Sequence, residues 1–115
     1  MARKVLQFEG MEVRGVRDLS HLSQGRLGAM QEFGIAGSSE NRERIVLHHL
    51  NQSPVGPVVE MPEANHNTWN QVQHPFRSTP GAGFTAEQRA AFDTWREDYW
   101  SWRATQELNR RRLGL

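Results

Sequence analysis

The sequence contains no cysteine, which excludes disulfide bonds and thiolate metal sites. A transition metal would therefore have to be bound by histidines, carboxylates or amides. The chain also has no apolar run approaching the roughly 20 residues of a membrane-spanning helix, so we expect no membrane contact. Its first residues, MARKVLQFEG, lack the apolar stretch that follows the charges of a signal peptide.

Lysine is almost absent. Of the 14 basic residues, 13 are arginine and Lys4 is the exception. Arginine binds phosphate through a planar, bidentate fork, whereas lysine acts as a point charge. The bias therefore fits a phosphate-binding protein, although arginine-biased codon usage explains it equally well. The formal net charge is only +1, so the overall charge does not by itself indicate a nucleic-acid-binding protein.

The length of 115 residues predicts a single domain, residues 1–115, with one modest core. Near the N-terminus, KVLQF and MEVRGV flank Glu9-Gly10, which predicts a β-hairpin. Ser23 is placed to cap a short helix that runs through Phe33, with Gly34 as its stop.

The middle of the chain predicts a strand, a turn, a second strand and a helix. RIVLHHL is apolar and β-branched, NQSPVGP has turn chemistry, and VVEM follows as the second strand. Pro62 fits the first position of a helix that runs to about residue 72, and Pro75 blocks its continuation. Residues 44–75 would thus form a ββα unit.

A long C-terminal helix is predicted from residue 86 to about residue 112, where glycine and proline are absent. Thr85 and Gln88 form a capping box at its start. Four aromatic residues share one face of this helix, and we expect them to be core rather than a platform for stacked bases: Phe92, Trp95, Tyr99 and Trp102. The fold class is therefore α+β.

Four of the five histidines lie within or beside the ββα unit, namely His48, His49, His66 and His74. Consecutive residues of a regular strand point to opposite faces of the sheet. The first two histidines can therefore serve one site only if the strand ends or bends there. The turn that begins at Asn51 makes such an ending plausible. The remaining histidine, in DLSHLS, is expected to have a packing or capping role.

The geometry of a metal site is left open by the spacing of the later histidines. His66 and His74 are eight residues apart, which is about 12 Å along an unbroken helix. Either the helix ends near Val72, so that His74 folds back, or Asn70 takes the position beside His66.

This collection of imidazoles suits phosphodiester hydrolysis. A neutral imidazole accepts a proton from water near pH 7, and a cation stabilises the leaving oxygen. Arg77 follows His74 closely and is the candidate phosphate ligand. Gln52 is close enough in sequence to orient a histidine, and Glu60 is either such a residue or an exposed strand residue.

The stretch LHHLNQSPVGPVVEMPEANHNTWNQVQHP resembles the LHH family of the HNH/endonuclease VII nuclease superfamily. The matching features are Leu47-His48-His49, Gln52, Gly56-Pro57, Glu60-Met61-Pro62, His66-Asn67 and His74-Pro75. The flanks FEGMEVRGVRDLSHLS and FTAEQRAAFDTWREDYWSWRATQEL are similar too, so the resemblance covers nearly the whole chain.

The resemblance implies a ββα-metal finger and a metal-dependent endonuclease. It implies that His49 is the general base and His48 a metal ligand, with His66 and His74 as further ligand candidates. The ion would be Zn²⁺, Ni²⁺, Mn²⁺ or Mg²⁺. Histidine and amide ligands suit the first three better than Mg²⁺. DNA is the favoured substrate and RNA the alternative.

The family also implies a biological setting, in which members are C-terminal toxin domains of bacterial polymorphic toxins. The chain would then be a secreted antibacterial effector domain that acts in the target-cell cytoplasm and is neutralised by a cognate immunity protein. Two other functions stay open: a non-catalytic binding module with a structural metal, and a ribonuclease that uses the histidine pair as metal-free acid and base. The C-terminal NRRRLGL either contacts phosphate or is a solvated helix end.

Overall fold

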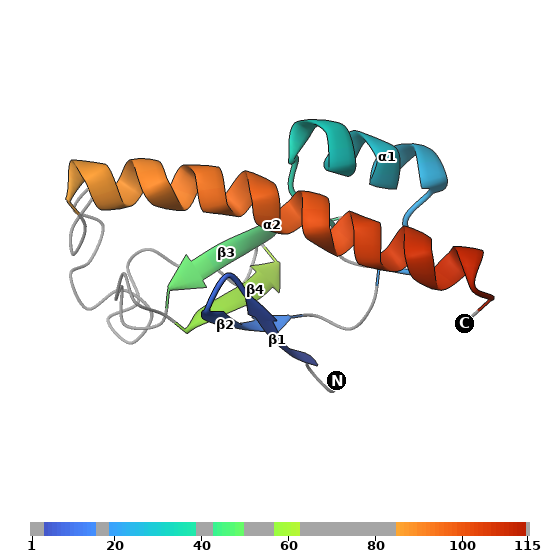
Figure 1. The fold of residues 1–115 in the computed structure, drawn as a ribbon, viewed down its shortest axis with the longest axis horizontal. Coiled ribbons are helices and arrows are strands. Elements are labelled where there is room, and N and C mark those ends of the chain that lie inside the picture. Colours follow the sequence, from blue (N-terminus) through green and yellow to red (C-terminus); the bar gives the residue numbers. More distant parts are fainter. Residues whose placement is uncertain (1–3, 16–18, 39–42, 50–56, 63–84, 115) are drawn as a thin grey trace.

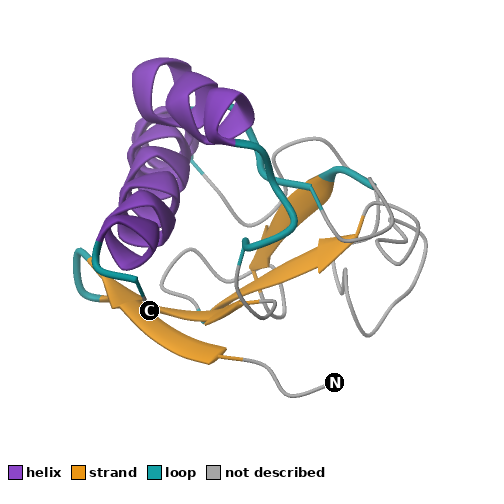
Figure 2. Ribbon diagram, turned by 90° about the vertical axis from the view of Figure 1, so that its right-hand side faces the viewer, coloured by secondary structure: helices purple, strands orange, loops and turns teal. Residues whose placement is uncertain are grey.

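The computed structural model describes residues 4–15, 19–38, 43–49, 57–62 and 85–114, and these form two layers. A four-stranded sheet makes one layer and two helices make the other (Figures 1 and 2). The elements, in chain order, are β1 (Lys4–Phe8), β2 (Met11–Gly15), α1 (Gln24–Phe33), β3 (Ile45–His49), β4 (Val58–Pro62) and α2 (Ala86–Arg112). The predicted α+β class is confirmed. No helix in these described ranges is long and apolar enough to cross a membrane.

The predicted N-terminal hairpin is confirmed, with β1 and β2 antiparallel and Phe8 opposite Met11. Glu9 and Gly10 both have positive φ, 50° and 80°. This is the backbone of a two-residue type I′ turn, whose twist matches that of the strands it joins. The local turn chemistry therefore fixes the register of the whole hairpin.

The strand order is β1-β2-β4-β3, so β3 lies at an edge of the described sheet. β4 pairs with β2 in parallel, with Val13 beside Val58, and with β3 in antiparallel fashion. The β3–β4 hairpin confirms the two strands predicted in the middle of the chain.

Pro62 is the last residue of β4, opposite Ile45, so its assignment to the first position of a helix is wrong. The Ile45 N–H donates to the carbonyl oxygen of Gly37 at 3.0 Å, away from β4. The Ile45–Pro62 pair therefore needs no donor from the proline nitrogen, and proline is tolerated at this strand end. The rest of the predicted 62–72 helix lies outside the described residues.

Both helices begin and end where the sequence predicts. The Ser23 hydroxyl accepts a hydrogen bond from the Arg26 N–H at 3.1 Å, and Gly34 closes α1 with a φ of 66°. Thr85 and Gln88 form the reciprocal capping box of α2. α1 lies beside the C-terminal half of α2 in Figure 1, joined to it by a hydrogen bond from Gln31 to Thr105.

The core lies between the sheet and α2. The aromatic face of α2 packs on Phe8, whose ring centroid is 5.0 to 5.7 Å from those of Trp95, Tyr99 and Trp102. This confirms the expectation that the stripe is core. Trp100, on the adjacent face, is also buried, and a Cβ at Gly37 would come within 2.9 Å of its ring.

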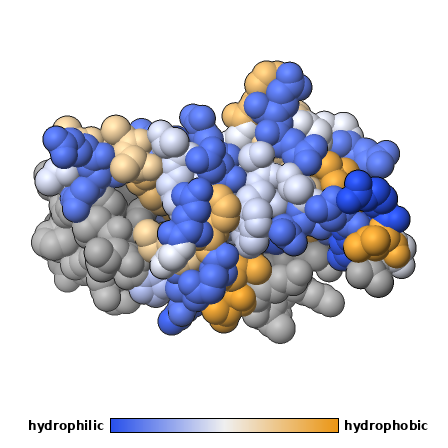
Figure 3. Space-filling view, viewed as in Figure 1, coloured by the Kyte–Doolittle hydropathy of each residue, from blue (hydrophilic) through white to orange (hydrophobic). Residues whose placement is uncertain are grey.

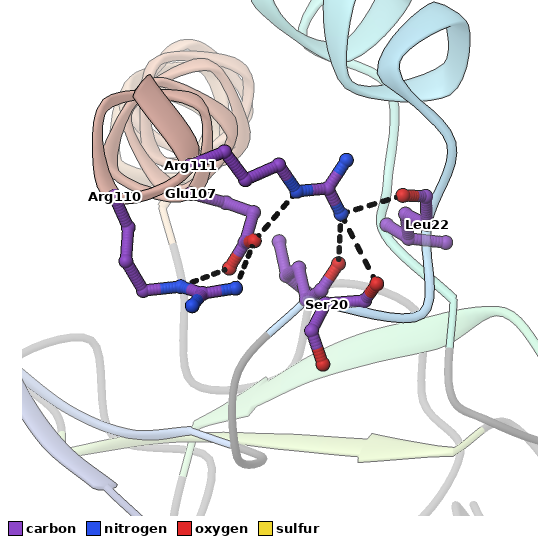
Figure 4. A network of polar contacts seen from close by, with 6 residues as sticks. Ser20, Leu22, Glu107, Arg110 and Arg111 are labelled. Carbon is purple, nitrogen blue, oxygen red and sulfur yellow. Dashed lines mark hydrogen bonds and ion pairs between the residues drawn. The ribbon is translucent and has the colours of Figure 1, made fainter. Parts of the chain in front are cut away.

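Two arginines of the basic C-terminal turn of α2 are held by hydrogen bonds (Figure 4). Glu107 is buried and accepts hydrogen bonds from Arg110 at 2.5 Å and from Arg111 at 2.8 Å. Arg111 also donates to the carbonyl oxygens of Ser20 and Leu22 at 3.1 and 2.6 Å. Arg111 therefore joins the segment before α1 to α2. The expected solvated end holds for Arg112, which is exposed at a strongly hydrophilic end of the molecule (Figure 3).

Candidate active site

The histidine pair stands at the C-terminal end of an edge strand. β3 extends to His49, which pairs with Val58, and His48 pairs with Val59. Both histidines are thus still paired with β4, and β3 ends directly after them.

His48 lies on the sheet face opposite to the helices. Leu47 belongs to the core that α2 covers, and strand residues alternate between faces, so the His48 side chain points the other way, together with that of Val59. Only 3% of His48 is exposed, so its imidazole is buried even though α1 and α2 lie on the other side. A buried nitrogen donor at a strand end has the chemistry of a ligand for Zn²⁺, Ni²⁺ or Mn²⁺.

Glu60 is fully buried on the helix side of β4, so the expectation of an exposed strand residue is wrong. Arg103 donates to both carboxylate oxygens, from Nε at 3.0 Å and from Nη2 at 3.1 Å. The Tyr99 hydroxyl donates a short hydrogen bond to Oε2. Glu60 thus links β4 to α2, on the opposite face of the sheet to His48.

Burial and neighbouring charges determine the protonation of Tyr99 and Arg103 in this network. Burial and the adjacent Glu60 carboxylate raise the pKa of Tyr99, which stays a neutral donor. Burial alone would lower the pKa of Arg103, but the charge of Glu60 and its hydrogen bonds outweigh burial and raise that pKa. Tyr99 therefore stays a neutral hydrogen-bond donor to Glu60, and Arg103 stays a charged one.

Sequence reasoning missed Tyr99 and Arg103 as partners of Glu60. The available signal was their spacing of four residues, which places both on one side of α2. A strand carboxylate flanked by apolar residues is a second signal, because such a group needs a buried counter-charge.

The other predicted site residues lie outside the described residues: His66, His74, Arg77, Asn70 and Gln52. Within the described segments, no group of three or more histidine or carboxylate side chains is placed to hold a metal ion. His48 is the predicted ligand that these segments contain.

A comparison with known protein families matches residues 27–106 to LHH, described as a nuclease of the HNH/ENDO VII superfamily with conserved LHH. In this chain the motif is Leu47-His48-His49, at the end of β3. The match spans most of α1, the β3–β4 hairpin and most of α2. No solved structure matches the chain. The protein is thus a nuclease that acts on nucleic acid, and its chain belongs to the LHH family of the HNH/ENDO VII superfamily.

Proposed function

We propose that this nuclease is a metal-dependent endonuclease that hydrolyses backbone phosphodiester bonds, with DNA as the favoured substrate. The observation that supports this most directly is the Leu47-His48-His49 motif at the strand end, with His48 buried on the face away from the helices. A buried imidazole next to a second histidine provides one group to bind and one to accept a proton.

His49 is the general base in this proposal and takes a proton from the attacking water. His48 binds a divalent cation together with His66 and His74, with Asn70 as the alternative donor. Such a cation, when bound, supplies positive charge that stabilises the transition state and the departing 3′-oxygen. Arg77 binds a phosphate oxygen through its guanidinium group.

The ligand chemistry favours Zn²⁺, Ni²⁺ or Mn²⁺ over Mg²⁺, which prefers carboxylate and water oxygens. The decisive assay measures plasmid nicking by the purified protein with EDTA and after adding back each ion. We expect EDTA to abolish nicking and one of the four ions to restore it. Cleavage of RNA alone that resists EDTA would indicate the metal-free ribonuclease instead. A protein inert with every ion, but unfolded by the chelator, would indicate a metal-stabilised binding module.

The biological role that follows from the family resemblance is that of an antibacterial effector domain. It would be secreted, act in the target-cell cytoplasm and be neutralised by a cognate immunity protein. An acidic surface on that partner would suit a cationic phosphate-binding site. Induction of the wild-type domain in bacteria should stop growth and fragment the chromosome, whereas induction of His49→Ala should do neither. Growth arrest without DNA damage would contradict a DNA-directed toxin.

A further inference from the structure

A groove with a volume of about 870 Å³ lies along the outer edge of β3. Its walls are both ends of α1, the segment 34–38, the first half of β3 and the middle of α2. We call this the β3-edge groove. It reaches Leu47, the residue directly before His48, so one end of the groove is one residue along β3 from the histidine pair.

Arginine side chains from three separate elements line this groove: Arg26 of α1, Arg44 just before β3, and Arg96 of α2. Glu97 is the acidic residue among the described lining residues. Arg26 is held against the wall by a hydrogen bond from Nη2 to the carbonyl oxygen of Ala36 at 2.8 Å. The ion pair of Arg96 with Asp93 is 3.4 Å long and solvent-exposed, so it leaves the Arg96 charge available to a ligand.

The strand edge adds backbone donors to these charges. The Ile45 N–H points away from β4, toward Gly37. Because the direction of N–H groups alternates along an antiparallel strand, the Leu47 N–H also points outward, into the groove. Backbone N–H groups are among the donors that bind phosphate oxygens in complexes with nucleic acid.

We propose that the β3-edge groove holds the sugar–phosphate backbone of the substrate on one side of the bond that is cut. This inference rests on the proposed function, since it places the cut at the histidine pair. Arg44 is five strand residues from His49, which is roughly 17 Å at about 3.3 Å per residue. A nucleic-acid strand advances about 3.4 Å per nucleotide along a duplex. Arg44 therefore contacts a phosphate several nucleotides from the cut, and at most about five.

The apolar walls fit this occupant as well. Phe33, at the end of α1, is 65% exposed and lines the groove beside the arginines. An exposed aromatic ring next to cationic side chains offers a stacking surface for a base. An extended acidic peptide could also form hydrogen bonds to the outer edge of β3. We favour nucleic acid because the protein is a nuclease and the lining combines three guanidinium groups with a single carboxylate among the described residues.

The test uses Arg44→Gln, Arg96→Gln and the double variant, with Arg89→Gln as the matched control. Arg89 is exposed on the same helix as Arg96 but does not line the groove. Binding to a fluorescent 30-base-pair duplex is measured by anisotropy at several salt concentrations, in a His49→Ala background that prevents cutting. Hydrolysis of bis(p-nitrophenyl) phosphate, a diester too small to reach the groove, is measured in the active background.

We expect each groove substitution to reduce the slope of log affinity against log salt by about one, and to weaken binding roughly five- to tenfold at 0.1 M salt. Arg89→Gln should change neither, and all the variants should hydrolyse the small diester at the wild-type rate. Equal thermal midpoints exclude misfolding.

Wild-type slopes in Arg44→Gln and Arg96→Gln would overturn the inference, and would point to a protein segment as the occupant. If the wild-type chain hydrolyses no phosphodiester while the slopes still fall as expected, the groove stands and the proposed cleavage mechanism fails.

Discussion

Replacement of Arg103 by methionine should destabilise the protein far more than a surface substitution would. The change removes the guanidinium that donates two hydrogen bonds to Glu60 and keeps a side chain of similar length. The Glu60 carboxylate would then remain fully buried, with Tyr99 as its remaining donor in this network. An uncompensated buried charge is among the few causes of a large mutational effect.

The expected cost is about 3–5 kcal/mol, the range measured when one partner of a buried ion pair is removed. In a domain of this size such a loss lowers the thermal midpoint by roughly 12–20 °C. The double variant Arg103→Met/Glu60→Gln should recover more than half of that cost, because no unpaired charge is left inside. For comparison, Glu12→Gln breaks an exposed ion pair with Arg14 and should cost less than about 1 kcal/mol.

Guanidinium chloride unfolding, followed by tryptophan fluorescence, gives the free energy of unfolding for all four proteins. Equal losses for Arg103→Met and Glu12→Gln would refute the reasoning, because Glu60 would then be solvated rather than buried. A double variant no more stable than Arg103→Met alone would refute it too.

Three further changes test other parts of the fold. Gly34→Ala should lower the free energy of unfolding by at least about 2 kcal/mol, because φ is 66° and the new Cβ would lie 2.8 Å from the Glu97 backbone. Gly25→Ala, where the new Cβ meets open space, should instead raise it by up to about 1 kcal/mol. Chemical denaturation compares the two variants, and equal effects would contradict the close approach at Gly34. Burial alone would raise the pKa of Glu107, but hydrogen bonds and charge from Arg110 and Arg111 lower it, so its stabilisation is complete above the unfolded pKa and is lost as the pH falls through the folded one. Thermal midpoints measured between pH 6 and pH 2 should therefore fall less steeply for Glu107→Gln than for wild type, and parallel curves would argue against this linkage. Thr85→Ala removes the cap of α2 and should lower stability by about 1 kcal/mol, while the exposed Thr94→Ala should be near neutral; circular dichroism melting separates the two, and a neutral Thr85→Ala would speak against the capping box.

The features that sequence predicted correctly depend on neighbouring residues. The Glu9-Gly10 turn, the Ser23 cap and the Thr85–Gln88 capping box are each written in a few consecutive positions. The aromatic face of α2 follows from helical spacing alone. Such signals can be read from one chain because the partners are at most a few residues apart.

The features that sequence did not predict depend on distant partners. Glu60 is bound by residues 39 and 43 positions further along, so its burial could not be read from its own strand. Arg111 contacts a carbonyl oxygen 89 positions away. Pro62 satisfied a local rule for helix starts, but the direction of the Ile45 N–H made it equally acceptable as a strand end.

In the candidate site, too, the features set by neighbouring residues were predicted, and those set by distant partners were not. Sequence placed His48 and His49 at a strand end, and β3 ends there. The roles of His49, His66, His74 and Arg77 stay predictions, since they depend on how the segments around the hairpin meet in space.

The central claim is that His49 activates water while His48 helps to bind a divalent ion. The most direct test is the single-turnover rate of plasmid cleavage at saturating metal, measured beside metal affinity by calorimetry, for wild type, His49→Ala and His48→Ala. Loss of a general base should slow cleavage by about 10²–10⁴-fold in His49→Ala with metal affinity retained, whereas His48→Ala should weaken both. A His49→Ala protein that cuts at the wild-type rate would contradict the claim.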